Sequence, residues 1–163
     1  SYKALTKSMH SKNQIHLMSS ITSAFKDVKL EDGIGLTEAN AIDDHKDKSF
    51  RDECRKNDEK ENWQTIPSSA LNDYYSSLSF FDAKGMRFHL PAFMIAEVKG
   101  EYRFGMSFAL THLSQYSKLQ FTLLSKEQRD AVKLFLEYLS EHLEYEFEKP
   151  TIKAAIEDYW SHT

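Results

Sequence analysis

Apolar side chains recur every three or four residues over most of the chain, a spacing that places them on one face of an α-helix. The first such face is formed by Ile15, Met18, Ile21 and Phe25. Asn13 can cap this helix, because its short side chain accepts a hydrogen bond from a free backbone N–H of the first turn. The segment before it is polar and has no apolar face. We therefore expect a flexible N-terminal arm over residues 1–12 and a helical domain from residue 13 onward.

A strongly charged helix is expected after a break at Gly33 and Gly35. Thr37 can cap the helical segment that follows the break. From residue 43 to residue 61, fourteen of the nineteen side chains are charged, eight acidic and six basic. Opposite charges fall four residues apart within it, and such pairs stabilise a solvated helix by a few tenths of a kcal/mol each. The segment is therefore interpreted as a solvated helix rather than as a basic patch.

The longest predicted helix runs from Ser125 to about Glu146. Ser125 and Gln128 have the spacing of a capping box, in which each side chain bonds the backbone of the other. We expect the buried stripe of this helix to comprise Ala131, Leu134, Phe135, Tyr138, His142 and Tyr145. Pro150 then favours the first turn of a last helix.

The most apolar part of the chain extends from Leu78 to Met94. Two structures are open for residues 79–89: a short β-hairpin in which Gly85 takes a positive φ angle, or a loop packed by its own aromatic side chains. Pro91 then favours the start of another helix, where its missing N–H costs nothing. In either case we expect three phenylalanines of this segment to be buried: Phe80, Phe88 and Phe93.

Together these elements predict a mainly α fold. A chain of 163 residues has the length of one domain, and no internal repeat or linker divides it. We therefore expect a single compact helical domain over residues 13–163, with at most one short β-hairpin near residues 79–89.

Charge and composition exclude several classes of protein. The net charge is −4 and the isoelectric point is about 6.0, whereas nucleic-acid-binding domains often have a basic surface and a value above about 9. No apolar run approaches the roughly 18 residues of a membrane-spanning helix. The single Cys54 cannot form an intramolecular disulfide, which is typical of a reducing compartment. We therefore expect a cytoplasmic protein that binds neither nucleic acid nor a membrane.

Several stretches of the chain occur in an order that resembles a known family. They include Gly35-Leu36-Thr37-Glu38-Ala39, Trp63 and Ile66-Pro67, and, as the most specific part, Leu78-Ser79-Phe80-Phe81-Asp82 followed by Phe88-His89-Leu90-Pro91-Ala92-Phe93-Met94. From about Ile21 to Trp160 the chain resembles a family of small, uncharacterised bacterial proteins, a domain of unknown function. The resemblance implies a bacterial, cytoplasmic origin and one compact domain. It implies no activity, cofactor or catalytic residue.

The sequence contains no motif for a metal, a cofactor or a covalent nucleophile. None of the seven histidines forms an H-x-x-x-H or H-E-x-x-H pair. A G-x-S-x-G elbow and a glycine-rich phosphate loop are both missing. Cys54 has no cysteine partner and no motif around it. We therefore expect no metal and no cofactor, and we assign no catalytic residue.

One group of polar residues interrupts the apolar centre of the chain: Asp82, Arg87 and His89. They can form an acid–base site, because a nearby carboxylate raises the pKa of a histidine and orients its ring. The alternative, which we favour, is that Asp82 caps the turn before Gly85 while Arg87 reaches the Asp82 carboxylate.

Four glutamates at the end of the longest predicted helix are spaced by four, three and four residues: Glu137, Glu141, Glu144 and Glu148. This spacing predicts one acidic stripe along the helix. The stripe lies at the C-terminal end, where the helix dipole already disfavours negative charge. It is either a solvated surface or a docking surface for a basic partner, since carboxylates along a rigid helix can imitate a row of phosphates.

The leading hypothesis is a non-catalytic protein-binding domain. Its most concrete form is a bacterial immunity protein that neutralises a basic, nuclease-type toxin through the four glutamates. Such a protein needs no catalytic motif, cofactor or disulfide. The alternative is a small enzyme of unknown reaction with a site around Asp82, Arg87 and His89.

Overall fold

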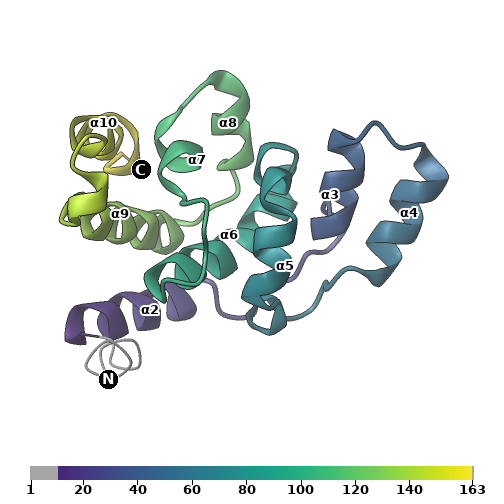
Figure 1. Ribbon diagram of the computed structural model, residues 1–163, viewed down its shortest axis with the longest axis horizontal. Helices are drawn as coiled ribbons and strands as arrows, with labels where there is room; N and C mark the ends of the chain where they lie inside the picture. Colours follow the sequence, from purple (N-terminus) through teal and green to yellow (C-terminus); the bar gives the residue numbers. More distant parts are fainter. Residues whose placement is uncertain (1–10, 163) are drawn as a thin grey trace.

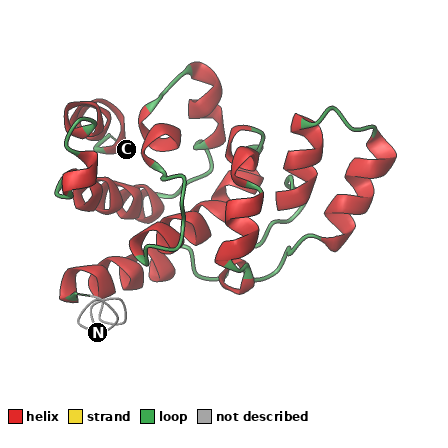
Figure 2. Ribbon diagram, viewed as in Figure 1, coloured by secondary structure: helices red, strands yellow, loops and turns green. Residues whose placement is uncertain are grey.

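The computed structural model describes residues 11–162, and this part of the chain folds into helices joined by loops, with no β-strand (Figure 2). The prediction of a mainly α fold in a single compact helical domain is confirmed. The helices are, in chain order, α2 (Lys12–Ala24), α3 (Leu36–Asp43), α4 (Lys48–Asn57), α5 (Ser68–Asp73), α6 (Ala83–Val98), α7 (Ser107–Thr111), α8 (Gln115–Gln120), α9 (Lys126–Ser140) and α10 (Lys149–Ala155). Short turns of 3-10 or π geometry join or extend them at Trp63–Thr65, Tyr75–Ser79, Leu143–Tyr145 and Ile156–Trp160.

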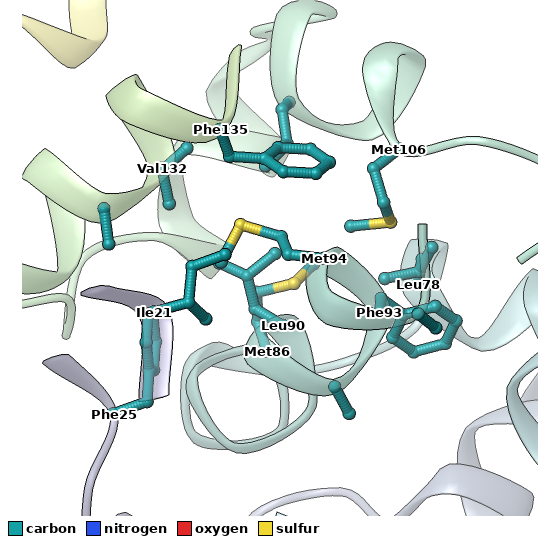
Figure 3. Packing of buried hydrophobic residues seen from close by; sticks show 14 of the residues in the cluster. Ile21, Phe25, Leu78, Met86, Leu90, Phe93, Met94, Met106, Val132 and Phe135 are labelled. Carbon is teal, nitrogen blue, oxygen red and sulfur yellow. The ribbon is translucent and has the colours of Figure 1, made fainter. Parts of the chain in front are cut away.

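Helix α6 lies at the centre of the fold (Figure 1), and eleven of its sixteen residues are buried. A helix that is apolar around most of its circumference is typical of one surrounded by other helices. Figure 3 shows part of this core, where α6 packs between α2 and α9 through Met86, Leu90 and Met94 with Ile21, Phe25, Val132 and Phe135. Of the three phenylalanines expected to be buried, Phe88 and Phe93 are fully buried and Phe80 is partly buried.

Neither of the two structures left open for residues 79–89, the β-hairpin and the loop, is present over the whole segment, because helix α6 begins at Ala83. Asp82 is the N-cap of α6, and its Oδ1 accepts hydrogen bonds from the backbone N–H of Gly85 at 2.8 Å and of Ile34 at 3.0 Å. Gly85 therefore lies in the first turn of a helix and does not take a positive φ angle. Glycine is needed there for another reason, because a Cβ atom would come within 2.6 Å of the Ile34 carbonyl oxygen.

Helix α6 also continues through Pro91, where the sequence predicts the start of a helix. A proline inside a helix removes one hydrogen bond and costs about 3 kcal/mol or more. The apolar side chains on either side of Pro91, such as Leu90 and Phe93, are fully buried. Their burial offsets the cost of the proline, since each contributes roughly 1.5–3 kcal/mol.

Two helices begin with a reciprocal cap. Ser11 and Gln14 form a capping box at the start of α2, so the predicted cap at Asn13 is wrong. The predicted capping box of Ser125 and Gln128 is present at the start of α9. Residues 1–10 of the predicted N-terminal arm lie outside the described residues.

The N-cap of α3 is Gly35 rather than the predicted Thr37, and a carboxylate from the end of α4 completes this cap. Asp58 Oδ1 accepts hydrogen bonds from the Thr37 hydroxyl at 2.6 Å and the Thr37 N–H at 3.0 Å, and Oδ2 accepts from the Glu38 N–H at 3.1 Å. A Cβ atom at Gly35 would overlap the Asp58 carboxylate, so only glycine fits. The negative charge also complements the positive end of the helix dipole.

Replacing Asp58 by alanine is expected to lower the free energy of unfolding by about 1–2 kcal/mol, because the first turn of α3 loses its capping oxygens. Denaturant melting followed by circular dichroism measures the change. The control is Asp52→Ala on α4, where the carboxylate makes only an exposed ion pair with Lys48 and a loss below about 1 kcal/mol is expected. Equal losses for the two variants would contradict the capping role of Asp58.

Candidate functional site

Asp82, Arg87 and His89 lie at the start of α6, but each of them bonds a different part of the fold. The Asp82 carboxylate caps the helix. The expected contact from Arg87 to Asp82 is wrong, because Arg87 Nη2 donates to Glu31 Oε2 at 2.8 Å. The two charged side chains are thus engaged elsewhere and do not orient the histidine.

His89 is fully buried, and its ring stacks in parallel on Phe81 with the ring centres 4.3 Å apart. Its Nδ1–H donates to the Gly85 carbonyl oxygen at 2.7 Å, and its Nε2 has no hydrogen-bond partner in the part of the chain that the structure describes. Burial lowers the pKa of His89 to about 4, so the ring is neutral at neutral pH. A neutral ring without exposed surface does not exchange protons with a substrate, and His89 is therefore a core residue.

Helix α9 ends at Ser140, earlier than the predicted end near Glu146, so the four glutamates do not share one helical stripe. Glu137 lies on α9, Glu141 is its C-cap, Glu144 lies in the turn that follows, and Glu148 is the N-cap of α10. All four side chains are exposed. We call residues 141–148, which connect α9 with α10, the acidic turn.

Tyr145 connects the acidic turn with the body of the protein. Its hydroxyl donates to Glu97 Oε1 at 2.8 Å, and the same carboxylate accepts a hydrogen bond from the Met106 N–H at 2.7 Å. Gly105 takes a φ angle of 75° beside this pair, and a Cβ atom there would lie 3.0 Å from the tyrosine oxygen. Burial raises the pKa of Glu97, and burial together with the Glu97 carboxylate raises the pKa of Tyr145. The acidic turn is thereby held against the end of α6.

Two apolar side chains of the acidic turn extend into solvent: Leu143 is 88% exposed and Phe147 is 98% exposed. From residue 143 to residue 148, apolar and acidic residues alternate along the chain. This alternation can be recognised in the sequence. If the helix is assumed to continue to Glu146, however, Tyr145 and its neighbours are assigned to helical faces, and the exposure of the apolar side chains is not predicted. Leu143 and Phe147 are the most exposed of the large apolar side chains among the described residues.

The negative charge of this region is not neutralised locally. Within residues 11–162, no ion pair involves the exposed glutamates of this region, which are Glu137, Glu141, Glu144, Glu146 and Glu148. Residues 1–119 carry 16 acidic and 16 basic side chains, whereas residues 120–163 carry nine acidic and five basic ones. The net charge of −4 therefore belongs to the C-terminal part of the chain, and α9 and α10 lie at one end of the molecule (Figure 1).

The described residues offer no buried centre for a metal ion. No three His, Cys, Asp or Glu side chains within residues 11–162 are placed so that they could hold one. Among the same residues, no helix is both long enough and apolar enough to span a bilayer. The exposed glutamates, Leu143 and Phe147 make the acidic turn and the end of α9 the candidate site.

Comparison with known proteins places the chain in a family without assigning an activity. No curated protein matches the chain, and no solved structure matches it. The model of the family described as "Family of unknown function (DUF6714)" matches residues 13–163, which include the whole acidic turn. The chain therefore belongs to this family of unknown function.

Proposed function

We propose that this protein is a non-catalytic protein-binding domain and that a basic protein docks on its acidic turn. One observation carries the proposal: Leu143 and Phe147 are almost fully exposed, between glutamates that have no ion-pair partner among the described residues. Burial of each of these two side chains in a partner contributes roughly 1.5–3 kcal/mol. The glutamates attract a basic partner and accelerate the encounter.

Most concretely, we propose a bacterial immunity protein that acts in the cytoplasm and neutralises a basic, nuclease-type toxin. A nuclease binds phosphates and therefore carries basic side chains, which the acidic turn complements in charge. Binding alone inactivates a toxin when it covers the active site, so no catalytic residue or cofactor is needed. The alternative, an enzyme with a site around Asp82, Arg87 and His89, lacks comparable support because separate partners inside the fold engage the three groups.

The test begins with recovery of a partner by pull-down from the native host, followed by binding kinetics at two salt concentrations. In the double variant Glu141→Lys with Glu144→Lys, the association rate at low salt is expected to fall about tenfold, because surface charge acts through steering. The salt dependence of association should also become weaker. The fold should remain intact, since exposed substitutions usually change stability by less than about 0.5 kcal/mol.

The matched control makes the same change of charge on α4, with Asp52→Lys and Glu53→Lys at the other end of the molecule (Figure 1). This variant should associate at nearly the rate of the wild type. Equal association rates for the two double variants would show that the acidic turn is a solvated surface and not a docking site. If no protein partner is recovered and a small molecule stabilises the domain instead, the enzyme hypothesis takes the place of this proposal.

A further inference from the structure

Helices α2 and α9 lie side by side and run in opposite directions (Figure 1). At one end of the pair, Gln14 Nε2 donates to the Tyr138 hydroxyl at 3.0 Å. At the other end, Gln128 Nε2 donates to the Ala24 carbonyl oxygen at 3.1 Å. These two contacts fix the register of the helices, so the surface between them has a defined shape.

A groove follows this helix pair. It consists of two hollows of about 360 and about 180 Å³, which share His16 of α2 and Leu134 of α9 in their linings. Leu134, whose burial the sequence predicts, is 40% exposed, whereas Leu17 and Ala131, which also line the hollows, are buried. The groove therefore has an apolar part at its centre that is open to solvent.

The two walls of the groove differ in their chemistry. The α2 wall includes three small hydroxyl side chains: Ser19, Ser20 and Ser23. The α9 wall carries four acidic side chains, Glu127, Asp130, Glu137 and Glu141, beside Ala131, Leu134 and Tyr138. Asp130 pairs with Lys126 at 3.0 Å, and the other three carboxylates have no ion pair within the part of the chain that the structure describes. Since Glu141 also begins the acidic turn, the groove and the acidic turn form one continuous surface.

We infer that this groove binds one amphipathic, basic α-helix of the partner. The inference rests on the proposed function, because it names the part of the partner that this end of the molecule receives. From Glu127 to Glu141 the acidic wall is about 21 Å long, the length of a helix of about four turns. Small serines allow close approach of a partner helix, whose axis must come within about 8–10 Å for packing. Its apolar face covers Leu134, and its Lys or Arg side chains face the carboxylates.

The probe is a fluorescein-labelled synthetic peptide of about 18 residues, or five helical turns, composed of leucine and lysine with the leucines at helical spacing. A scrambled peptide of the same composition is its control. Fluorescence anisotropy with the full chain is expected to show binding of the patterned peptide about tenfold tighter than that of the scrambled one. Only the patterned helix presents its leucines to Leu134 and its lysines to the carboxylates at the same time.

Two groove variants test where the peptide binds. Ser19→Trp narrows the groove and should weaken binding of the patterned peptide about tenfold, a change of about 1.4 kcal/mol. Ser49→Trp makes the same replacement at an exposed position of α4 and should leave binding unchanged. Leu134→Glu provides a second groove variant, and it should remove the preference for the patterned peptide. Circular dichroism confirms that each variant is folded.

Three outcomes would overturn the inference. Equal binding of the patterned and scrambled peptides would show that the negative charge of the protein attracts both without regard to pattern. Equal binding of the patterned peptide by the Ser19→Trp and Ser49→Trp variants would exclude the groove as the binding site. Binding that appears only after removal of residues 1–10, which contain Lys3 and Lys7, would assign the groove to the chain's own N-terminal segment.

Phe147→Ser distinguishes this inference from the proposed function. It should weaken binding of a recovered protein partner, because the proposed function buries the Phe147 side chain in that partner. If Phe147→Ser weakens binding of the recovered partner and Ser19→Trp does not, the proposed function stands and the groove is rejected as the binding site. Peptide binding in the groove without any recoverable protein partner would reject the proposed function alone.

Discussion

Truncation of Phe88 to alanine is expected to lower the free energy of unfolding by about 3–5 kcal/mol, the usual cost of removing a buried phenylalanine ring. Phe88 is fully buried on the central helix α6, and its ring meets the His89 ring edge-on with the centres 4.9 Å apart. The helices around α6 are held by contacts of their own, so the cavity left by the ring cannot collapse completely. Denaturant melting of the wild type and of the variant measures the difference.

Phe108→Ala is the matched control, because Phe108 is 69% exposed and its truncation creates no cavity. A loss of less than about 1 kcal/mol is expected for this variant, as for most surface substitutions. If Phe88→Ala also cost less than about 1 kcal/mol, the segment from Leu78 to Met94 would not be packed in the core. That result would favour an exposed recognition loop instead of helix α6.

Lowering the pH from about 7 to about 4 is expected to destabilise the protein by up to about 3 kcal/mol through His89 alone. The pKa of His89 is about 4 in the folded protein, whereas its ordinary value is 6.5. Between these values the unfolded chain binds a proton that the folded core excludes, so the free energy of unfolding falls as the pH decreases. Above about pH 6.5 the ring is neutral in both states, and the contribution is fully present.

His89→Phe isolates this effect, because a phenylalanine ring can stack on Phe81 but cannot be protonated. Denaturant melting at several pH values should show a weaker pH dependence for this variant than for the wild type. The raised pKa of Glu97 acts in the opposite direction, since the folded protein binds that proton more readily, and it cancels in the comparison. His112→Phe, at an exposed position, should behave like the wild type. An unchanged pH dependence in His89→Phe would show that His89 is not the group responsible.

Features that depend on neighbouring residues could be predicted from the sequence. The capping box of Ser125 and Gln128 is an example, because residues three positions apart satisfy one another's backbone groups. The burial of Phe88 and Phe93 also followed from a strongly apolar segment. For residues 79–89 of the same segment the sequence left a hairpin or a loop open, and it placed the start of a helix at Pro91, whereas α6 begins at Ala83. In the fold, burial around α6 outweighs the proline, and the carbonyl of Ile34 explains the glycine.

The sequence by itself determined the helical class of this protein, the sign of its charge and the cluster of glutamates near residues 137–148. Only the tertiary structure decided that α9 ends at Ser140 and that Leu143 and Phe147 extend into solvent. The groove likewise depends on α2 and α9, whose contact at Ala24 and Gln128 joins residues 104 positions apart. Helical periodicity reports which residues share a face, but it carries no information on which distant helix covers that face or leaves it open.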